Sequence, residues 1–236
     1  MVYLKHFIII LTIGLVCFGQ LYASPIKDSM TKTIESTVGN KFAPAEKWEC
    51  DINGNMLDWV QGKIPKLKLV GTNVKYDKMS LRKIDIFMTK IKFDLLKKRL
   101  KSCETATFTA EITDKEMTSL IKENISAIEK PIISSKNGLI QIQGQYKINK
   151  IKINFALTSS LSVRNGKNFV LDIENMTVTN YNVKIPKWIQ NKIVNSINPV
   201  YTFPENKIGL FVNSITPVNG YFSLSGSLDP EKVSKF

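Results

Sequence analysis

The feature that most restricts the fold is an alternation of apolar and polar residues that changes parity at one point. Apolar residues are even-numbered from Ile140 to Ile148 and odd-numbered from Ile151 to Leu157. Alternate residues of a strand face the same side of a sheet, so one uninterrupted strand cannot place both sets on one face. A two-residue turn at Asn149-Lys150 resolves the conflict, because it pairs 148 with 151, 146 with 153 and 142 with 157. The pattern predicts an antiparallel hairpin with one apolar face.

A second hairpin is expected directly after the first. Asn165-Gly166 separates apolar residues at Leu161 and Val163 from a further apolar set that begins at Phe169. A three-residue loop with glycine in the left-handed region keeps both sets on one face. The sheet is therefore predicted to be antiparallel and one-faced.

Apolar parity also switches within an earlier segment. Ile84, Ile86 and Met88 are even-numbered, whereas Ile91 and the apolar residues that follow are odd-numbered. A β-bulge or a turn near Thr89-Lys90 would restore a single apolar face. Such breaks bend and twist a strand, so a curved sheet is expected.

Three segments have the spacing of amphipathic helices. The first begins at Ser24-Pro25 and carries an apolar residue at every fourth position up to Gly39. A capping box formed by Thr113 and Glu116 opens the second helix, whose expected apolar face runs from Met117 to Ile128. The third begins at Pro186 and ends before Pro199.

These segments combine into one α+β domain. A short helix is expected at 55–60, and a last strand pair at 208–212 and 219–224. No linker rich in Gly, Ser or Pro divides the sequence. We predict a single domain over residues 24–230, built as a curved antiparallel sheet packed around amphipathic helices, followed by a flexible tail at 231–236.

The N-terminus has the pattern of a secretory signal. An apolar run from Phe7 to Gly19 follows Lys5 and precedes the small residue Ala23. The run is shorter than the ~18–20 residues that a membrane-spanning helix needs. We expect residues 1–23 to be removed, with cleavage after Gly19 and an uncleaved anchor as alternatives. The protein is then exported to the periplasm or cell envelope, peripheral to the membrane.

The three cysteines have different expected fates. Cys17 follows Val16, whereas an acylated bacterial cysteine normally follows Gly, Ala or Ser, so Cys17 is treated as part of the apolar run. Cys50 and Cys103 remain in an exported, oxidising setting. A disulfide between them and two free thiols are both admissible, and the sequence does not decide.

Catalytic motifs are largely excluded. The one histidine, His6, lies in the segment expected to be removed, which excludes Ser-His-Asp and Cys-His catalysis and histidine zinc sites. A Walker loop, a Rossmann glycine set, a nucleophile elbow and a Cys/His metal cluster are also absent from the sequence. Asp172 and Glu174 alternate with apolar residues, as on the solvated face of a strand, so a carboxylate hydrolase is only a third hypothesis. We expect no enzyme activity, no catalytic residue, no cofactor and no metal site.

The charge is strongly positive and consists mostly of lysine. Lys and Arg total 33 against 20 acidic residues, with arginine only at Arg82, Arg99 and Arg164. Scarce arginine argues against bidentate phosphate recognition, and nucleic acid is not an expected partner. Removal of residues 1–23 would lower the net charge by one, from +13 to +12.

Basic residues concentrate between Lys78 and Lys101, where the local net charge is +7. This segment has two interpretations: attraction to an anionic membrane surface, or compositional drift toward A/T-rich codons. For the first interpretation the candidate contacts are Lys90, Lys92, Lys97, Lys98 and Arg99.

The apolar sheet face also has two interpretations. It either forms an ordinary core or, with helices lying against a concave sheet, encloses a cavity for an apolar ligand. The candidate lipid-binding residues are Ile142, Tyr146, Ile153 and Phe155.

The order of elements resembles the LmeA-like family of exported bacterial phospholipid-binding proteins. The similar points are the signal and N-terminal helix, Lys83-Ile-Asp-Ile-Phe-Met with Phe93-Asp-Leu-Leu, the helix start Ile112-Thr-Asp-Lys-Glu-Met, the hairpins of 139–173, and the ending Ile208-Gly-Leu-Phe-Val to Gly226. The family's Leu-Pro-Phe-Gly-like stretch corresponds here only to Phe203-Pro204 followed by Ile208-Gly209. The resemblance implies a curved sheet around helices, like tubular lipid-binding proteins, and lipid binding in the envelope without catalysis.

The leading hypothesis is therefore an exported envelope protein that binds a phospholipid or similar amphiphile in an apolar groove. The alternative is a structural or protein-interaction module whose apolar face is filled by its own core.

Overall fold

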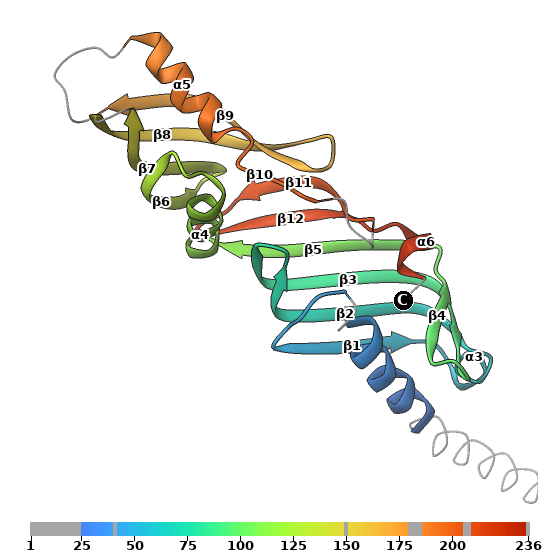
Figure 1. The fold of residues 1–236 in the computed structure, drawn as a ribbon. Coiled ribbons are helices and arrows are strands. Elements are labelled where there is room, and N and C mark those ends of the chain that lie inside the picture. Colours follow the sequence, from blue (N-terminus) through green and yellow to red (C-terminus); the bar gives the residue numbers. More distant parts are fainter. Residues whose placement is uncertain (1–24, 40–41, 149–150, 179–185, 205–208, 235–236) are drawn as a thin grey trace, which may run out of the picture.

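The computed structural model describes residues 25–39, 42–148, 151–178, 186–204 and 209–234 (Figure 1). The predicted signal segment and the turn residues Asn149-Lys150 lie outside these ranges.

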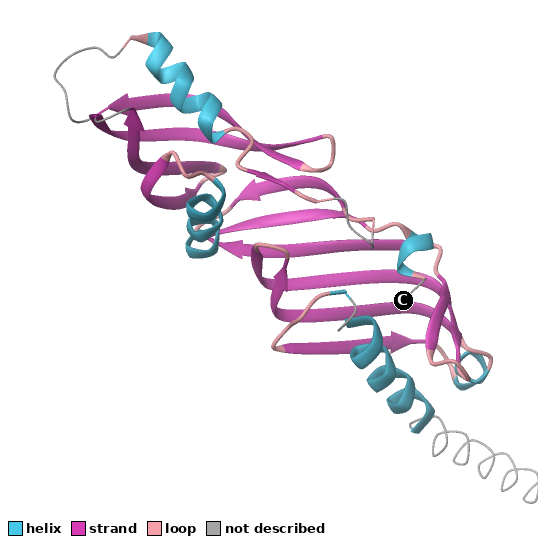
Figure 2. Cartoon of the chain, in the orientation of Figure 1, coloured by secondary structure: helices cyan, strands magenta, loops and turns pink. Residues whose placement is uncertain are grey.

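Two antiparallel sheets and a few short helices make up the fold (Figure 2). The first sheet has the strand order β1 (Lys47–Asn53), β2 (Lys63–Tyr76), β3 (Met79–Asp94), β5 (Thr105–Thr113), β12 (Tyr221–Ser227) and β11 (Phe211–Pro217), with β4 (Arg99–Ser102) paired to β3. The second has the order β10 (Tyr201–Thr202), β9 (Asn168–Val178), β8 (Ile151–Arg164), β7 (Leu139–Ile148) and β6 (Ile128–Lys136). The helices are residues 25–34, which continue as the π-helix η1 (Glu35–Gly39), then α3 (Met56–Val60), α4 (Asp114–Asn124), α5 (Lys187–Ile197) and α6 (Pro230–Val233).

The two sheets follow one another along an elongated molecule, with α3 and β4 at one end and α5 at the other (Figure 1). Backbone hydrogen bonds join them where they meet. The amide of Val212 in β11 donates to the carbonyl of Gly166 at 3.0 Å, and the amide of Gly220 donates to the carbonyl of Ser135 in β6 at 3.2 Å. The seven-stranded sheet therefore continues into the five-stranded one.

The predicted register of the β7–β8 hairpin is confirmed. Ile148 pairs with Ile151, Tyr146 with Ile153 and Ile142 with Leu157. The second hairpin is confirmed as well, because Arg164 pairs with Asn168 and leaves a three-residue loop between them. Asn165 and Gly166 in this loop have positive φ angles of 56° and 63°.

The parity break in β3 is matched by one in β2, so the register between the two strands does not change and no β-bulge forms. Lys90 has a φ of 47°, and the strand continues beyond it. Thr89 lies opposite Lys66 and Ile91 opposite Ile64, so Pro65 of β2 lies opposite Lys90. Both strands therefore shift by one residue together, and Ile64 and Ile91 stay buried.

The helix predictions are confirmed, with one difference in length. Thr113 caps α4: its Oγ1 accepts from the amide of Glu116 at 3.2 Å, and Glu116 accepts from the amide of Thr113 at 2.8 Å. The apolar spacing that extended the expected helix to Ile128 ends earlier, since α4 ends at Asn124 and Ile128 begins β6.

The predicted class, α+β with a curved antiparallel sheet, is confirmed. The described part of the predicted tail forms α6, where Val233 is 1% exposed. The assignment of residues 24–230 to a single domain stays a prediction.

Candidate functional site

The structure brings the four candidate lipid-binding residues together on one face of the β7–β8 hairpin. Tyr146 lies opposite Ile153, and Phe155 lies opposite Gly144. Ile142, Tyr146, Ile153 and Phe155 are 0%, 4%, 4% and 2% exposed. This face is therefore inside the protein.

Helix α5 is attached to this face. The hydroxyl groups of Tyr146 and Ser196 in α5 hydrogen bond at 2.9 Å. Ile193 and Ile197 of the same helix are fully buried. Access to the β7–β8 face from this side therefore requires α5 to move.

A groove of about 900 Å³ lies between α5 and β9. Residues of α5 and β9 line it, together with residues of the β8–β9 turn and of the segment after α5. Six of the lining residues are asparagines, and the apolar ones include Leu171, Met176 and Val194. Its volume falls within the ~300–1,000 Å³ usual for ligand pockets.

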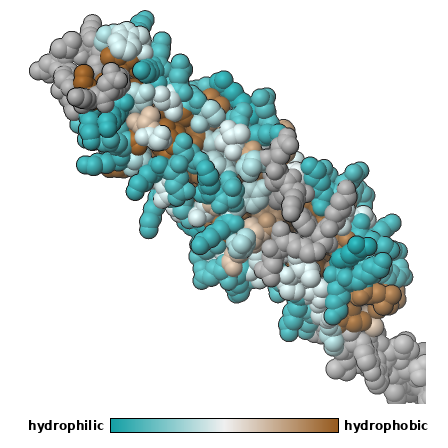
Figure 3. All heavy atoms as spheres, viewed as in Figure 1, coloured by the Kyte–Doolittle hydropathy of each residue, from teal (hydrophilic) through white to brown (hydrophobic). Residues whose placement is uncertain are grey.

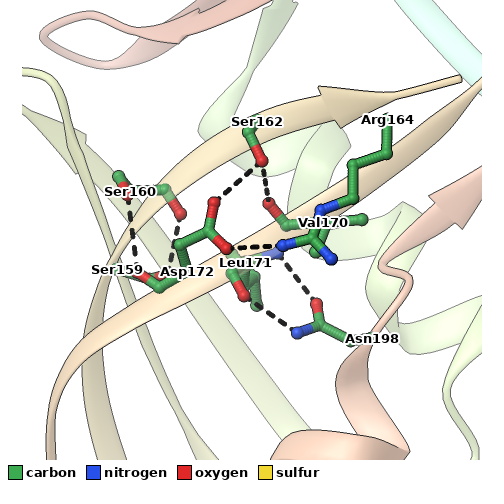
Figure 4. Close-up of polar contacts among 8 residues, drawn as sticks. All are labelled: Ser159, Ser160, Ser162, Arg164, Val170, Leu171, Asp172 and Asn198. Carbon is green, nitrogen blue, oxygen red and sulfur yellow. Dashed lines mark hydrogen bonds and ion pairs between the residues drawn. The ribbon is translucent and has the colours of Figure 1, made fainter. Parts of the chain in front are cut away.

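Polar contacts at the floor of this groove fix its geometry (Figure 4). Asp172 accepts from Arg164 at 2.9 Å and from the Ser162 hydroxyl at 2.9 Å. The Asn198 side chain accepts from the amide of Leu171 and donates to its carbonyl, both at 2.8 Å. Asp172, which was considered for acid/base chemistry, is thus the partner of an arginine on the solvated side of the sheet.

The core of the seven-stranded sheet is closely packed. Phe42, Tyr76 and Phe203 stack beside one another, with centroid distances of 5.9 Å and 6.4 Å from Tyr76. A partly enclosed void beside them measures about 10 Å³, at the lower limit of the roughly 10–15 Å³ that one water molecule needs.

The five cations predicted to contact an anionic surface lie at the end of the β3–β4 hairpin. Lys90 and Lys92 belong to β3, Lys97 and Lys98 to the turn, and Arg99 to β4. All five are exposed. Lys90 forms an ion pair with Glu104 at 2.8 Å.

A second, apolar pocket of about 260 Å³ opens at the same end. Its floor is Ile64, Pro65 and Ile91. Asp58 of α3 and three lysines, Lys63, Lys90 and Lys92, form its rim. Sequence reasoning named two of these lysines but missed the pocket, which depends on α3 folding back beside β2.

The two described cysteines are free thiols. Burial raises the pKa of Cys50 to about 12 and also raises the pKa of Cys103. Both are therefore protonated at neutral pH. In the described ranges no group of three or more His, Cys, Asp or Glu side chains could hold a metal ion, and no helix has the length and apolarity to cross a membrane.

Comparison with known proteins relates most of the chain to a family. A family model described as LmeA-like phospholipid-binding matches residues 24–226. No curated protein and no solved structure matches the chain.

Proposed function

The chain belongs to the LmeA-like phospholipid-binding family, and from this membership we propose that it is an exported, non-catalytic protein of the cell envelope that binds a phospholipid or a similar amphiphile. The match over residues 24–226 is the observation that carries the proposal, since it includes both sheets and α5.

The groove between α5 and β9 is the proposed entrance for the ligand. It has the volume of a ligand pocket, and its asparagine side chains offer both donors and acceptors to a polar headgroup. The acyl part would lie beneath α5, against Ile142, Tyr146, Ile153 and Phe155. Tyr146 is hydrogen bonded to Ser196 of α5 and all four side chains are buried, so binding would be coupled to movement of that helix.

The cations of the β3–β4 end, Lys90, Lys92, Lys97, Lys98 and Arg99, are proposed to attract an anionic membrane surface. Each exposed cation near such a surface contributes ~1 kcal/mol, and the attraction falls off within a Debye length. Vesicle binding should therefore weaken as salt is raised.

Lipid extraction tests the proposal directly. The protein as isolated from expressing cells is analysed by native mass spectrometry, and its extract by lipid mass spectrometry. A bound phospholipid is expected, and a photoactivatable phospholipid should crosslink to peptides of β7, β8 and α5. Reproducible absence of lipid from the protein and from the crosslinked peptides would overturn the proposal.

A matched pair of variants on α5 locates the entrance. Val194 lines the groove, whereas Lys192 is exposed on the same helix and is not among the lining residues. Val194→Trp should lower the amount of bound lipid at least severalfold, while Lys192→Trp should leave it unchanged. Equal lipid in both variants would place the entrance elsewhere.

One observation favours the alternative function, a structural or protein-interaction module. The four candidate residues are at most 4% exposed, as in a core filled by its own side chains. Isolation of a defined envelope partner with no lipid bound would support this alternative.

A further inference from the structure

The end of the molecule formed by α3 and the β3–β4 turn exposes large apolar side chains. Leu57 is 75% exposed and Val60 51% exposed, both on α3. Leu96, in the turn, is 96% exposed, and its neighbour Leu95 is 40% exposed. We call these four residues the leucine tip.

The leucine tip is one contiguous site, because α3 and the β3–β4 turn are held against each other. The amide of Phe93 donates to the carbonyl of Gly62, two residues after α3, at 2.6 Å. A side chain added at Gly62 would lie within 3.9 Å of Leu95 and collide with the Phe93 carbonyl. Apolar surface is visible at this end of the molecule in Figure 3.

The turn that carries Leu96 is fixed by its own hydrogen bonds. The carboxylate of Asp94 accepts from the amide of Leu96 at 3.1 Å and from the amide of Lys97 at 2.9 Å. Leu96 is thus held outward by an ordered turn that a single aspartate closes.

Cations surround the leucine tip. Lys63 and Lys92 line the pocket beside it, and Lys97, Lys98 and Arg99 follow Leu96 directly. Within the described residues these five side chains form no salt bridge of 4.0 Å or less. Clustered apolar side chains beside four lysines and one arginine match the acyl chains and the headgroups of an anionic bilayer.

We propose that the leucine tip inserts into an anionic lipid bilayer. The molecule then stands on the membrane with its α3 end in the bilayer and its α5 end farthest from it. The inference rests on the proposed lipid-binding function in one respect, that the protein meets a membrane to exchange its ligand. Pro25 lies at the same end, since Lys27 is placed over the Trp59 ring of α3 at 6.0 Å. The helix of residues 25–34 therefore begins at the membrane-facing end.

Vesicle binding tests the insertion. The protein as isolated from expressing cells is mixed with vesicles of phosphatidylcholine alone, or of phosphatidylcholine with phosphatidylglycerol, and bound protein is measured by sedimentation. Binding is expected only with the anionic lipid. Leu57→Ser/Leu96→Ser should lower the partition coefficient about a hundredfold, or about tenfold per leucine that enters the bilayer.

The matched control carries the same kind of change away from the tip. Trp188 on α5 is 60% exposed and Ile132 on β6 is 62% exposed. Trp188→Ser/Ile132→Ser should bind vesicles like the unmodified protein. An equal loss in this variant, or no loss in Leu57→Ser/Leu96→Ser, would overturn the proposal.

Two tryptophans report orientation without new residues. In anionic vesicles with brominated acyl chains, Trp59 of α3 should be quenched and Trp188 should not. Trp59→Phe should therefore remove the quenchable fluorescence, and Trp188→Phe should retain it; the reverse result contradicts the proposed orientation. A dimer in solution that Leu57→Ser/Leu96→Ser dissociates would instead assign the tip to a second copy and overturn the proposal.

Lipid content separates this inference from the proposed function. Leu57→Ser/Leu96→Ser protein, loaded by detergent exchange, should still hold phospholipid, because the tip is remote from the groove at α5. Lipid-free protein that still binds vesicles through the tip would refute the proposed function alone.

Discussion

The two ends of the molecule differ in whether their large apolar side chains are buried or exposed. At the α5 end, Ile142 and Phe155 are buried on the face to which Tyr146 binds α5, and the groove outside is lined mostly by polar residues. At the α3 end, Leu57 and Leu96 are exposed among cations. Substitutions should therefore cost folding stability at the first end and membrane affinity at the second.

The largest effect is expected for Phe155→Ala. If the β7–β8 face is packed by α5 and the core, the free energy of unfolding should fall by about 3–5 kcal/mol. Urea denaturation of lipid-free protein measures this. A loss below about 1 kcal/mol would indicate that Phe155 faces an open cavity and would weaken the contrast between the two ends.

A smaller effect is expected where the two sheets are tied together. Tyr201 belongs to β10, which pairs with β9, and Asp77 lies in the turn between β2 and β3. The Tyr201 hydroxyl donates to the Asp77 carboxylate at 2.7 Å. Tyr201→Phe removes this bond and should lower the free energy of unfolding by about 1–3 kcal/mol, because a part-buried acceptor loses its donor. Two separate unfolding transitions in this variant would show that the sheets are independent units.

Leu96→Ser should leave the free energy of unfolding within about 0.5 kcal/mol of its original value. The side chain is 96% exposed, so the folded state loses almost no contact. Thermal unfolding without lipid checks this. Clear destabilisation would mean that Leu96 packs within the protein, which contradicts its role at the tip.

The smallest effect is local and depends on pH. The hydrogen bond from the Lys97 amide is the first cause that holds the pKa of Asp94 below its usual range. Because the pKa of Asp94 is lower in the folded state, its charged carboxylate stabilises the turn at every pH above the ordinary aspartate pKa. This stabilisation is lost as the pH falls through the folded-state pKa. Amide exchange of Leu96 and Lys97, corrected for intrinsic rates, should become less protected under those acidic conditions and in Asp94→Ala at any pH. Unchanged protection would show that the carboxylate does not hold the turn.

Alternation was sufficient to predict the hairpins, because a one-residue shift would have turned Ile153 or Tyr146 into solvent. It was less informative where polar residues occupy inward positions. Ser135 is 4% exposed in β6, and its hydroxyl donates to Asp114 at 2.6 Å. Pro131 and the positive φ of Lys130 also interrupt the alternation in this segment. For these reasons β6, the strand that follows α4, could not be predicted from its apolar pattern.

The site was predictable only in part for the same reason. The cations near Leu96 can be identified from the sequence, but the sequence alone does not distinguish an exposed leucine from a buried one. Strand β1 was also missed, although Trp48, Cys50 and Ile52 alternate, because the run is short. The exposure of Leu57 follows from the orientation of α3 after β1, which a local pattern does not contain.

The break in alternation that Pro65 and Lys90 share restricts how this hairpin can change in length. Deleting Lys90 alone would leave Pro65 as an extra residue on β2, so two residues of β2 would oppose one of β3 and the ladder would acquire a true bulge. Deleting both residues together would leave a regular ladder with Ile64 and Ile91 still facing inward. Insertions and deletions at this end of the molecule should therefore be tolerated best in pairs, one residue on each strand.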